Sequence, residues 1–354
     1  MRYTVRHVTR FAYESAITES VMEVRMQPRS DAMQRCVHFS LTSTPASRVM
    51  MYQDPDGNTV HHFNIPARLS RLAITAEALV DCDAPQALPD RLAANAWTEL
   101  DAAVGSGEAW EFLAPSRFAT PTALQAEFVK DAGLAREGDP LVTLQTIMRE
   151  MYARFEYSPR STRVDSPIDD ALKTRRGVCQ DFAHIFISIA RQLGVPTRYV
   201  SGYLFHDPSR TDRSGDGATH AWVESLLPEL GWVGFDPTNN IVADDRHIKV
   251  AIGRDYADVP PTRGVYVVNC STSRDRGVKC WPTIRCRRGQ SCRYCSTRAI
   301  CHRARTSRGR VVVQSRNPSS DGVPNGNGHS VASALSWVDA SCRVRHQAAS
   351  VRAS

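Results

Sequence analysis

The chain has 354 residues, 42% of them hydrophobic and 23% charged, which is the composition of an ordinary globular protein with room for two domains. Its formal net charge of +7 comes from residues 266–354, which hold 16 Lys and Arg against 3 Asp and no Glu. Residues 1–265 hold 28 basic and 34 acidic side chains and are therefore mildly acidic. For this reason we do not expect nucleic acid as a partner. The start of the chain is polar, which argues against a signal peptide, and no stretch approaches the roughly 18 apolar residues of a membrane span. Only three cysteines precede residue 266, which argues against a disulfide framework. These features together favour a cytoplasmic protein.

Residues 1–82 are predicted to form a small β-sandwich. Residues 3–11 alternate between apolar and more polar side chains, which is the period of a half-buried strand. Residues 54–58, with the sequence Asp-Pro-Asp-Gly-Asn, are typical of a turn, and a strand-like segment follows at residues 59–65. Residues 71–80 are another apolar segment of strand length. Short strands separated by turns at this spacing indicate two packed sheets.

Residues 83–265 are predicted to form one α+β domain. The first half is rich in Ala, Leu, Glu and Met at helical spacing, and the second half changes to a helix, a strand and a hairpin. The predicted helices include residues 88–104, 122–135 and 140–155, and the predicted strands are residues 197–204 and a hairpin within residues 219–236. The expected core is a helix packed on an antiparallel sheet.

Residues 266–354 have a different composition. They are rich in Arg, Ser and Cys, contain no Glu, and show no sustained periodicity. One interpretation is a disordered basic tail. The other is translation in the wrong frame after Val265, because a GC-rich gene read out of frame gives abundant Arg and Cys with little Lys and Glu. The composition leaves both open.

A cysteine stands at the predicted start of a buried helix. Gly177 and Cys179 are followed by apolar residues at helical spacing, and the pattern ends at Gly194 and Pro196. Those apolar residues are Phe182, Ile185, Phe186, Ile189 and Leu193. Cys179 therefore falls in the first helical turn, where unpaired N–H groups and the helix dipole favour a thiolate and can bind an oxyanion. The alternative is a small core cysteine without a chemical role.

His220 and Asp236 are predicted to face each other across a hairpin. If that hairpin is centred on Pro228, the numbers of paired residues sum to 456, and His220 lies directly opposite Asp236 on the same face. A carboxylate beside an imidazole orients the ring and stabilises its protonated form, which is the partner that a thiolate nucleophile needs. The alternatives are an ordinary buried histidine and a turn-forming Asp-Pro pair.

Three motifs together resemble those of the bacterial transglutaminase-like superfamily, in the order of that family. They are Gly-Val-Cys-Gln-Asp-Phe-Ala-His at residues 177–184, His-Ala-Trp-Val-Glu at residues 220–224, and Gly-Trp-Val-Gly-Phe-Asp-Pro-Thr at residues 231–238. The β-rich start is similar to the N-terminal domain that often precedes this core, so the resemblance covers roughly residues 1–265. It implies a papain-like core in which Cys179 is the nucleophile, His220 the base and acid, and Asp236 the orienting carboxylate.

The same resemblance implies an enzyme that attacks an amide of a protein or peptide substrate, such as a glutamine side chain, and forms a thioester. Transfer of the acyl group to an amine would make the protein a transglutaminase, and transfer to water would make it a cysteine peptidase or amidase. The triad serves both reactions. A non-catalytic binding protein that retains the fold is a further alternative. We expect no cofactor, and no calcium loop of the D-x-[DN]-x-[DN]-G kind is present.

Two other groups of side chains are not expected to be sites. The three predicted catalytic residues are zinc-ligand types, but residues 1–265 lack close pairs such as C-x-x-C, so no metal is expected there. Cys292 and Cys295 form one such pair in the tail, without a second properly spaced pair. His184 follows Cys179 by five residues and would not face the thiol on a helix, so a structural role is expected for it.

Overall fold

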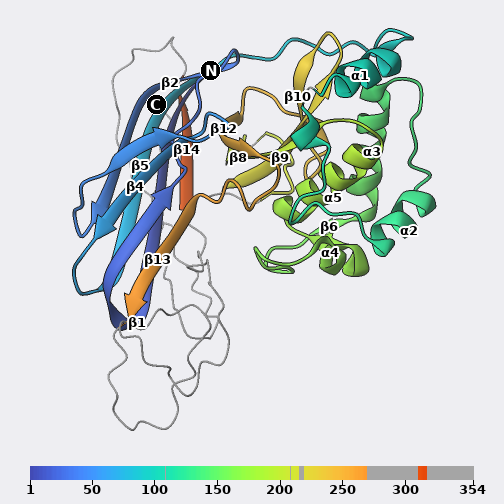
Figure 1. Cartoon of the computed structure of the whole chain (residues 1–354). Coiled ribbons are helices and arrows are strands. Elements are labelled where there is room, and N and C mark those ends of the chain that lie inside the picture. The colour runs from blue at the N-terminus through green and yellow to red at the C-terminus, as the bar shows by residue number, and fades with distance from the viewer. Residues whose placement is uncertain (108, 208, 215–218, 269–309, 317–354) are drawn as a thin grey trace, which may run out of the picture.

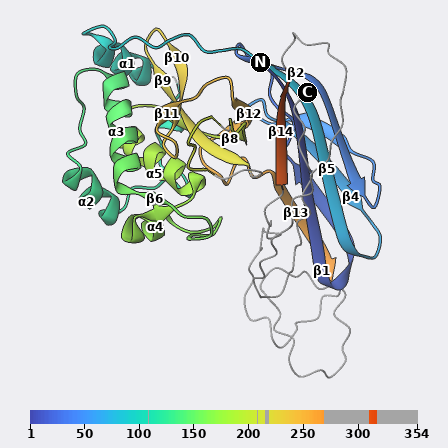
Figure 2. The ribbon, with the colours of Figure 1, turned by 180° about the vertical axis from the view of Figure 1, so that it is seen from behind.

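The structure, a computed structural model, describes residues 1–107, 109–207, 209–214, 219–268 and 310–316 (Figure 1). A sheet of long strands stands on one side of the molecule, and a domain of helices around a second sheet lies on the other, as the views from front and back agree (Figures 1 and 2). None of the helices in these ranges is long and apolar enough to cross a membrane.

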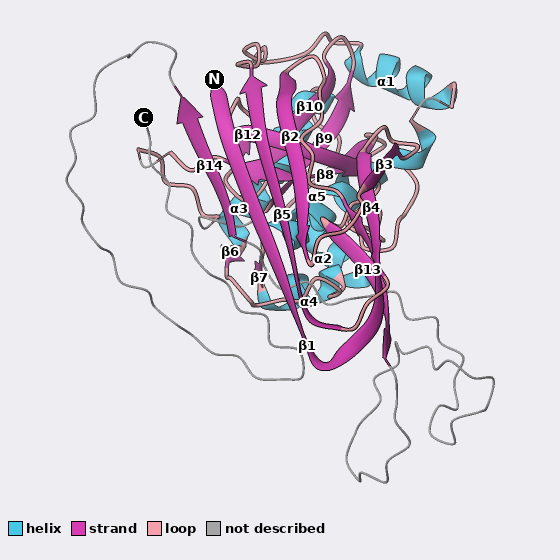
Figure 3. Cartoon of the chain, turned by 90° about the vertical axis from the view of Figure 1, so that its left-hand side faces the viewer, coloured by secondary structure: helices cyan, strands magenta, loops and turns pink. Residues whose placement is uncertain are grey.

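The first sheet is antiparallel and contains seven strands. They are β1 (Arg2–Val24), β2 (Gln34–Thr44), β3 (Met50–Gln53), β4 (Thr59–Ile65), β5 (Leu69–Cys82), β13 (Thr262–Val268) and β14 (Arg310–Arg316). One edge of the long strand β1 pairs with β5 and then with β4, and its other edge pairs with β14 and then with β13. Figure 3 shows β14, β1, β5 and β2 side by side in this order.

The β-rich first domain is confirmed, but its strands form one sheet instead of the two layers of a sandwich. The reason is the length of β1, whose 23 residues provide partners for β4 and β5 in a single continuous sheet. The predicted domain boundary at residue 265 runs through β13, which pairs with β1 and so belongs to the first sheet. Residues 310–316, expected to lie in an irregular tail, form β14; the rest of the predicted tail, residues 269–309 and 317–354, lies outside the described residues.

The second domain surrounds a five-stranded antiparallel sheet in the order β11-β10-β9-β8-β12. Its strands are β8 (Thr197–Leu204), β9 (His220–Leu227), β10 (Gly231–Asp236), β11 (Ile241–Val242) and β12 (His247–Gly253), and a separate short pair is β6 (Glu156–Tyr157) with β7 (Arg176–Gly177). Its helices are α1 (Ala96–Gly105), the 3-10 helix η1 (Trp110–Phe112), α2 (Ala123–Asp131), α3 (Pro140–Arg154), α4 (Ile168–Thr174) and α5 (Cys179–Gln192). The predicted α+β core, a helix on an antiparallel sheet, is confirmed.

Helix α5 is the centre of this domain. It packs on β8 and β9 on one side and on α3, α4 and α2 on the other, so every residue from Gln180 to Arg191 is buried. The apolar stripe of the sequence supplies the sheet contact; for example, the Phe186 ring lies 6.0 Å from the ring of Phe235 in β10. Burial on all sides fixes the position of the first turn of α5, and with it Cys179.

The two sheets meet along β8 and β12. Asn58, in the turn before β4, donates its side-chain N–H to the Ile252 carbonyl and accepts the Ile252 backbone N–H, each at 2.8 Å. Gln34 donates to the Lys249 carbonyl at 2.8 Å. Tyr3 and Val5 of β1 belong to the same apolar core as α5. The first domain therefore holds β12, the edge strand of the second sheet, in place.

Candidate active site

The start of α5 is fixed by the side chain of Asp181. Its carboxylate accepts the backbone N–H of Val178 at 2.8 Å and the hydroxyl of Thr162. Gly177 leaves room for this arrangement, since a Cβ there would lie 3.1 Å from Asp181 and from the Phe182 ring. Cys179 is the first residue of the helix, and its free thiol is only half-buried. The turn that precedes α5 thus presents Cys179 at the surface of an otherwise buried helix.

His220 begins β9 and Asp236 ends β10, but they are not the cross-strand pair that the sequence predicted. The residue numbers of the observed pairs, such as Leu227 with Gly231, sum to 458 and not to 456. The loop is centred on Glu229, which adopts a left-handed φ of 62°. Side chains alternate with a period of two, so a shift of two keeps both residues on the same face. His220 Nε2 lies 2.8 Å from Asp236 Oδ2.

The Asp236 carboxylate is fully buried and surrounded by hydrogen-bond donors. Its Oδ1 accepts the backbone N–H groups of Thr238 at 2.9 Å and of Asn239 at 3.3 Å, and its Oδ2 also accepts the Asn239 side-chain N–H at 2.7 Å. Burial would raise the pKa of Asp236, but the charge of His220 and its hydrogen bonds outweigh that effect and lower it far below the usual range. Asp236 is therefore ionised at neutral pH.

His220 links this carboxylate to Cys179. Its ring is 4% exposed and lies on the ring of Trp222, with an interplanar angle of 24°. Burial lowers the pKa of His220, but the charge of Asp236, the hydrogen bond to it and the neighbouring Cys179 side chain together raise the pKa. Because Nε2 faces Asp236, Nδ1 is the nitrogen left for the thiol. The structure therefore places the Asp236 carboxylate against His220 Nε2, and the Cys179 side chain is close enough to the same ring to raise its pKa.

A second histidine, His247 at the start of β12, also contacts Asp236. Its Nε2 lies 3.3 Å from Asp236 Oδ2, and its Nδ1 lies 3.0 Å from Asp244 Oδ1. Burial lowers the pKa of His247, but the hydrogen bonds to the two carboxylates raise it overall. The sequence analysis missed this residue, because nothing in the spacing of His247 from Asp236 shows that β12 returns beside them.

The arrangement also bears on the metal question. In the described part of the chain, His220, Asp236 and His247 place one ligand atom each within 4.8 Å of one another, and Cys179 does not belong to this group. Two imidazoles and a carboxylate are a zinc-type donor set. Here the Asp236 oxygen that faces both rings is engaged in hydrogen bonds with them. The absence of a metal stays a prediction.

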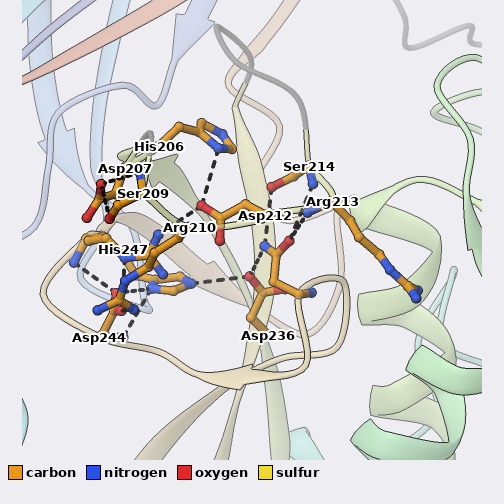
Figure 4. Close-up of polar contacts among 12 residues, drawn as sticks. His206, Asp207, Ser209, Arg210, Asp212, Arg213, Ser214, Asp236, Asp244 and His247 are labelled. Carbon is orange, nitrogen blue, oxygen red and sulfur yellow. Dashed lines mark hydrogen bonds and ion pairs between the residues drawn. The ribbon is translucent and has the colours of Figure 1, made fainter.

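The loop between β8 and β9 is bonded to the same carboxylate through Asn239. Figure 4 shows Arg213 and Ser214 of this loop near Asp236. The Asn239 side-chain oxygen accepts the backbone N–H of Arg213 at 2.8 Å, while its NH₂ group donates to Asp236 at 2.7 Å. On the far side of His247, Asp244 pairs with Arg246 at 3.0 Å and with Arg210 at 3.1 Å. The loop and the carboxylate therefore form one continuous polar network.

His184 contacts residues other than the three predicted catalytic residues. Its ring is buried and stacks on Phe118 with a centroid distance of 5.3 Å. Its Nε2 accepts the backbone N–H of Tyr256 at 3.2 Å, and burial lowers its pKa to about 4. These contacts agree with the structural role expected for it.

Comparisons with known proteins place this site in a family. The model of the transglutaminase-like superfamily matches residues 129–237, and that of the bacterial transglutaminase-like N-terminal region matches residues 3–81. An uncharacterized protein of Mycobacterium leprae is 34% identical over 277 residues, which cover 77% of this chain and 96% of that protein. The chain belongs to the transglutaminase-like superfamily.

Two further proteins are similar over smaller parts or at lower identity. The protein-glutamine gamma-glutamyltransferase of Pseudomonas aeruginosa is 30% identical over 128 residues, which are 33% of this chain and 19% of that enzyme. A candidate cysteine protease from Cytophaga hutchinsonii, known from its crystal structure, has a TM-score of 0.57 at 22% identity and covers 75% of this chain and 85% of that one. That likeness shows a shared fold.

Proposed function

We propose that Cys179, His220 and Asp236 form a catalytic triad that transfers an acyl group from an amide through a thioester. The observation that carries this proposal is the contact of the buried His220 ring with Asp236 at 2.8 Å, together with a Cys179 side chain close enough to raise the pKa of the same ring. A raised histidine pKa favours the imidazolium, which stabilises a neighbouring thiolate and is ready to give up its proton.

The proposed first half of the reaction breaks the amide. The Cys179 thiolate attacks the carbonyl carbon and forms a C–S bond, and the negative charge moves to the carbonyl oxygen. N–H groups in the first turn of α5 have no intrahelical acceptors and supply donors for that oxyanion. The His220 imidazolium protonates the leaving nitrogen, the C–N bond breaks, and a thioester and a free amine result.

The proposed second half releases the acyl group. Neutral His220 takes a proton from an acceptor, which is a primary amine in transfer and water in hydrolysis. The acceptor attacks the thioester carbon, the C–S bond breaks, and the Cys179 thiolate is restored beside a protonated His220. Asp236 keeps the ring oriented throughout and stabilises its charge.

We propose the side-chain amide of glutamine as the acyl donor. Support comes from the likeness of 128 residues to the glutamyltransferase of Pseudomonas aeruginosa. The second candidate is cleavage of main-chain amides, which the shared fold with the candidate cysteine protease of Cytophaga hutchinsonii favours. The same triad serves both, so the product decides between them.

A single assay separates these outcomes. A glutamine-containing peptide is incubated with the protein, with and without a small primary amine, and its mass is followed. Amide exchange with the amine indicates transfer, conversion of glutamine to glutamate indicates hydrolysis, and two fragments indicate a peptidase. Cys179→Ala should abolish every product, whereas Cys36→Ala, a control in β2 of the first sheet, should react as the unchanged chain does. Full turnover by Cys179→Ala would show a non-catalytic role for this site.

A further inference from the structure

An arginine-lined cavity of about 590 Å³ lies in the second domain, and its lining includes Arg176, three residues before Cys179. Its walls come from the end of α3 and β6, from the end of α4 and β7, and from the loop between β8 and β9. The charged side chains that line it are Arg154, Arg175, Arg176 and Arg213, against the single acidic residue Glu156. A cavity of this size accommodates a small ligand or a segment of a peptide.

Two of these arginines have no acidic partner in the described parts of the chain. Arg176 pairs with Glu156 at 3.0 Å, and Arg154 pairs with Glu150 at 2.9 Å. No ion pair is formed by Arg175 or Arg213 with any described carboxylate. The cavity therefore carries an uncompensated positive charge.

The guanidinium of Arg213 is held in place by neutral groups. It lies 3.3 Å from the centroid of the Tyr152 ring and donates to the backbone carbonyls of Tyr152 at 2.9 Å and Phe155 at 3.1 Å. These contacts orient the group and leave its charge unneutralised. An arginine oriented in this way loses little conformational freedom when it binds an anion.

Arg175 is held similarly, at a position where its backbone is unusual. Its φ of 54° is in the left-handed region, which glycine commonly occupies at the end of a helix such as α4. Its guanidinium lies 4.7 Å from the Phe128 ring and 5.2 Å from the Phe155 ring, and its buried Nη1 has no hydrogen-bond partner. A buried N–H group without an acceptor is unfavourable unless a ligand provides one.

The residues that line the cavity are connected to Cys179 on one side and to Asp236 on the other. Arg176 precedes Cys179 by three residues, so their Cα atoms are at most about 10 Å apart even along an extended chain. On the other side, the backbone N–H of Arg213 is bonded to Asn239, which also donates to Asp236. A substrate whose amide reaches Cys179 can therefore place a neighbouring side chain in the cavity.

We propose that this cavity binds a carboxylate side chain, Glu or Asp, of the peptide that carries the reacting amide. This inference rests on the proposed function and names its substrate class, an acidic peptide. A guanidinium matches a carboxylate with two parallel N–H···O bonds, and Arg175 and Arg213 are the two groups without such a partner. A hydrogen-bonded ion pair of this kind should change kcat/KM by roughly 5- to 10-fold, mostly through KM.

The test compares amidated glutamine peptides that are identical except for Glu or Gln at one position within three residues of the reacting glutamine. We expect one of the Glu peptides to be preferred by roughly 5- to 10-fold at low salt, and the preference to shrink as ionic strength rises to about 0.5 M. Arg175→Gln should remove the preference. The control Arg149→Gln, an exposed residue of α3 outside the cavity, should keep it. Thermal unfolding verifies that both variants fold.

Each outcome has a distinct meaning. If no peptide reacts, or if Cys179→Ala reacts as well as the unchanged chain, the proposed function fails. If turnover needs Cys179 but Glu and Gln peptides react equally, or if Arg175→Gln keeps the preference, the cavity proposal alone is overturned. A free C-terminal carboxylate that is preferred while Glu peptides are not would overturn the assignment to a side chain.

Discussion

Replacement of His247 by Leu should destabilise the protein by about 3 kcal/mol near pH 6. The ring joins two carboxylates, with Asp236 at 3.3 Å and Asp244 at 3.0 Å. Hydrogen bonds to charged groups contribute about 1.5–3 kcal/mol each, and the longer bond to Asp236 belongs at the low end. His247→Gln is the matched variant, because its amide keeps one donor for Asp236. We expect this variant to lose about half as much stability as His247→Leu.

The loss of stability in His247→Leu should be larger at low pH than at high pH. The hydrogen bonds to Asp236 and Asp244 raise the pKa of His247 above its usual 6.5, against burial and the charge of His220. A group whose pKa is raised in the folded state stabilises it fully below the pKa of the unfolded state, and this contribution is lost as pH rises through the folded-state pKa. The stability gap between the unchanged chain and His247→Leu should therefore narrow as pH rises above 6.5.

Urea unfolding at several pH values between about 5 and 9 measures this gap, with circular dichroism to verify that both variants fold. A gap that widens with pH, or one that stays below about 0.5 kcal/mol at pH 6, would refute the view that the protonated ring bridges the two carboxylates.

Three further substitutions or truncations test other parts of the structure. Gly202→Ala places a Cβ 2.3 Å from the Ile248 carbonyl and 2.5 Å from the Trp222 ring, so unfolding measurements should show a loss of about 1–3 kcal/mol, and a neutral result would contradict this close packing. Burial raises the pKa of Asp181 to about 6, so the stability of the unchanged chain relative to Asp181→Asn should fall by roughly 2–3 kcal/mol as pH rises from about 4 to 6; parallel stability curves for the two chains would contradict the raised pKa. A chain ending at residue 261 lacks β13 and should unfold at a lower temperature than one ending at residue 268, and equal melting temperatures would show that β13 does not stabilise the first sheet.

Local patterns in the sequence predict much of the second domain. The apolar stripe after Cys179 defines a helix that is found at Cys179–Gln192, and Asp139 followed by Pro140 marks the start of α3, where the Asp139 side chain accepts the Leu141 N–H at 2.9 Å. The hairpin was predicted with its register wrong by two residues, because the geometry of the Pro228–Leu230 loop is not apparent from its composition. The shared face of His220 and Asp236 survived this error, since only an odd shift moves side chains to the other face.

Features that depend on distant parts of the chain could not be predicted. β13 pairs with β1 across more than two hundred residues, so its membership in the first sheet has no local signal. The contact of His247 with Asp236 depends on β12 folding back beside β8, which no motif indicates. The arginine cavity likewise combines three segments that are separated in sequence. In each case long-range pairing, and not local propensity, decides the structure.

The reactivity of Cys179 tests the account most directly. The rate of alkylation by iodoacetamide is measured at pH 5 to 9 by peptide mapping, with Cys36 as the internal reference, because burial raises the pKa of that thiol. If His220 and Cys179 form an ion pair, Cys179 should be labelled selectively at mildly acidic pH, and His220→Ala should slow this labelling by about 100-fold or more. Labelling of Cys179 no faster than that of Cys36, or labelling unaffected by His220→Ala, would contradict the triad.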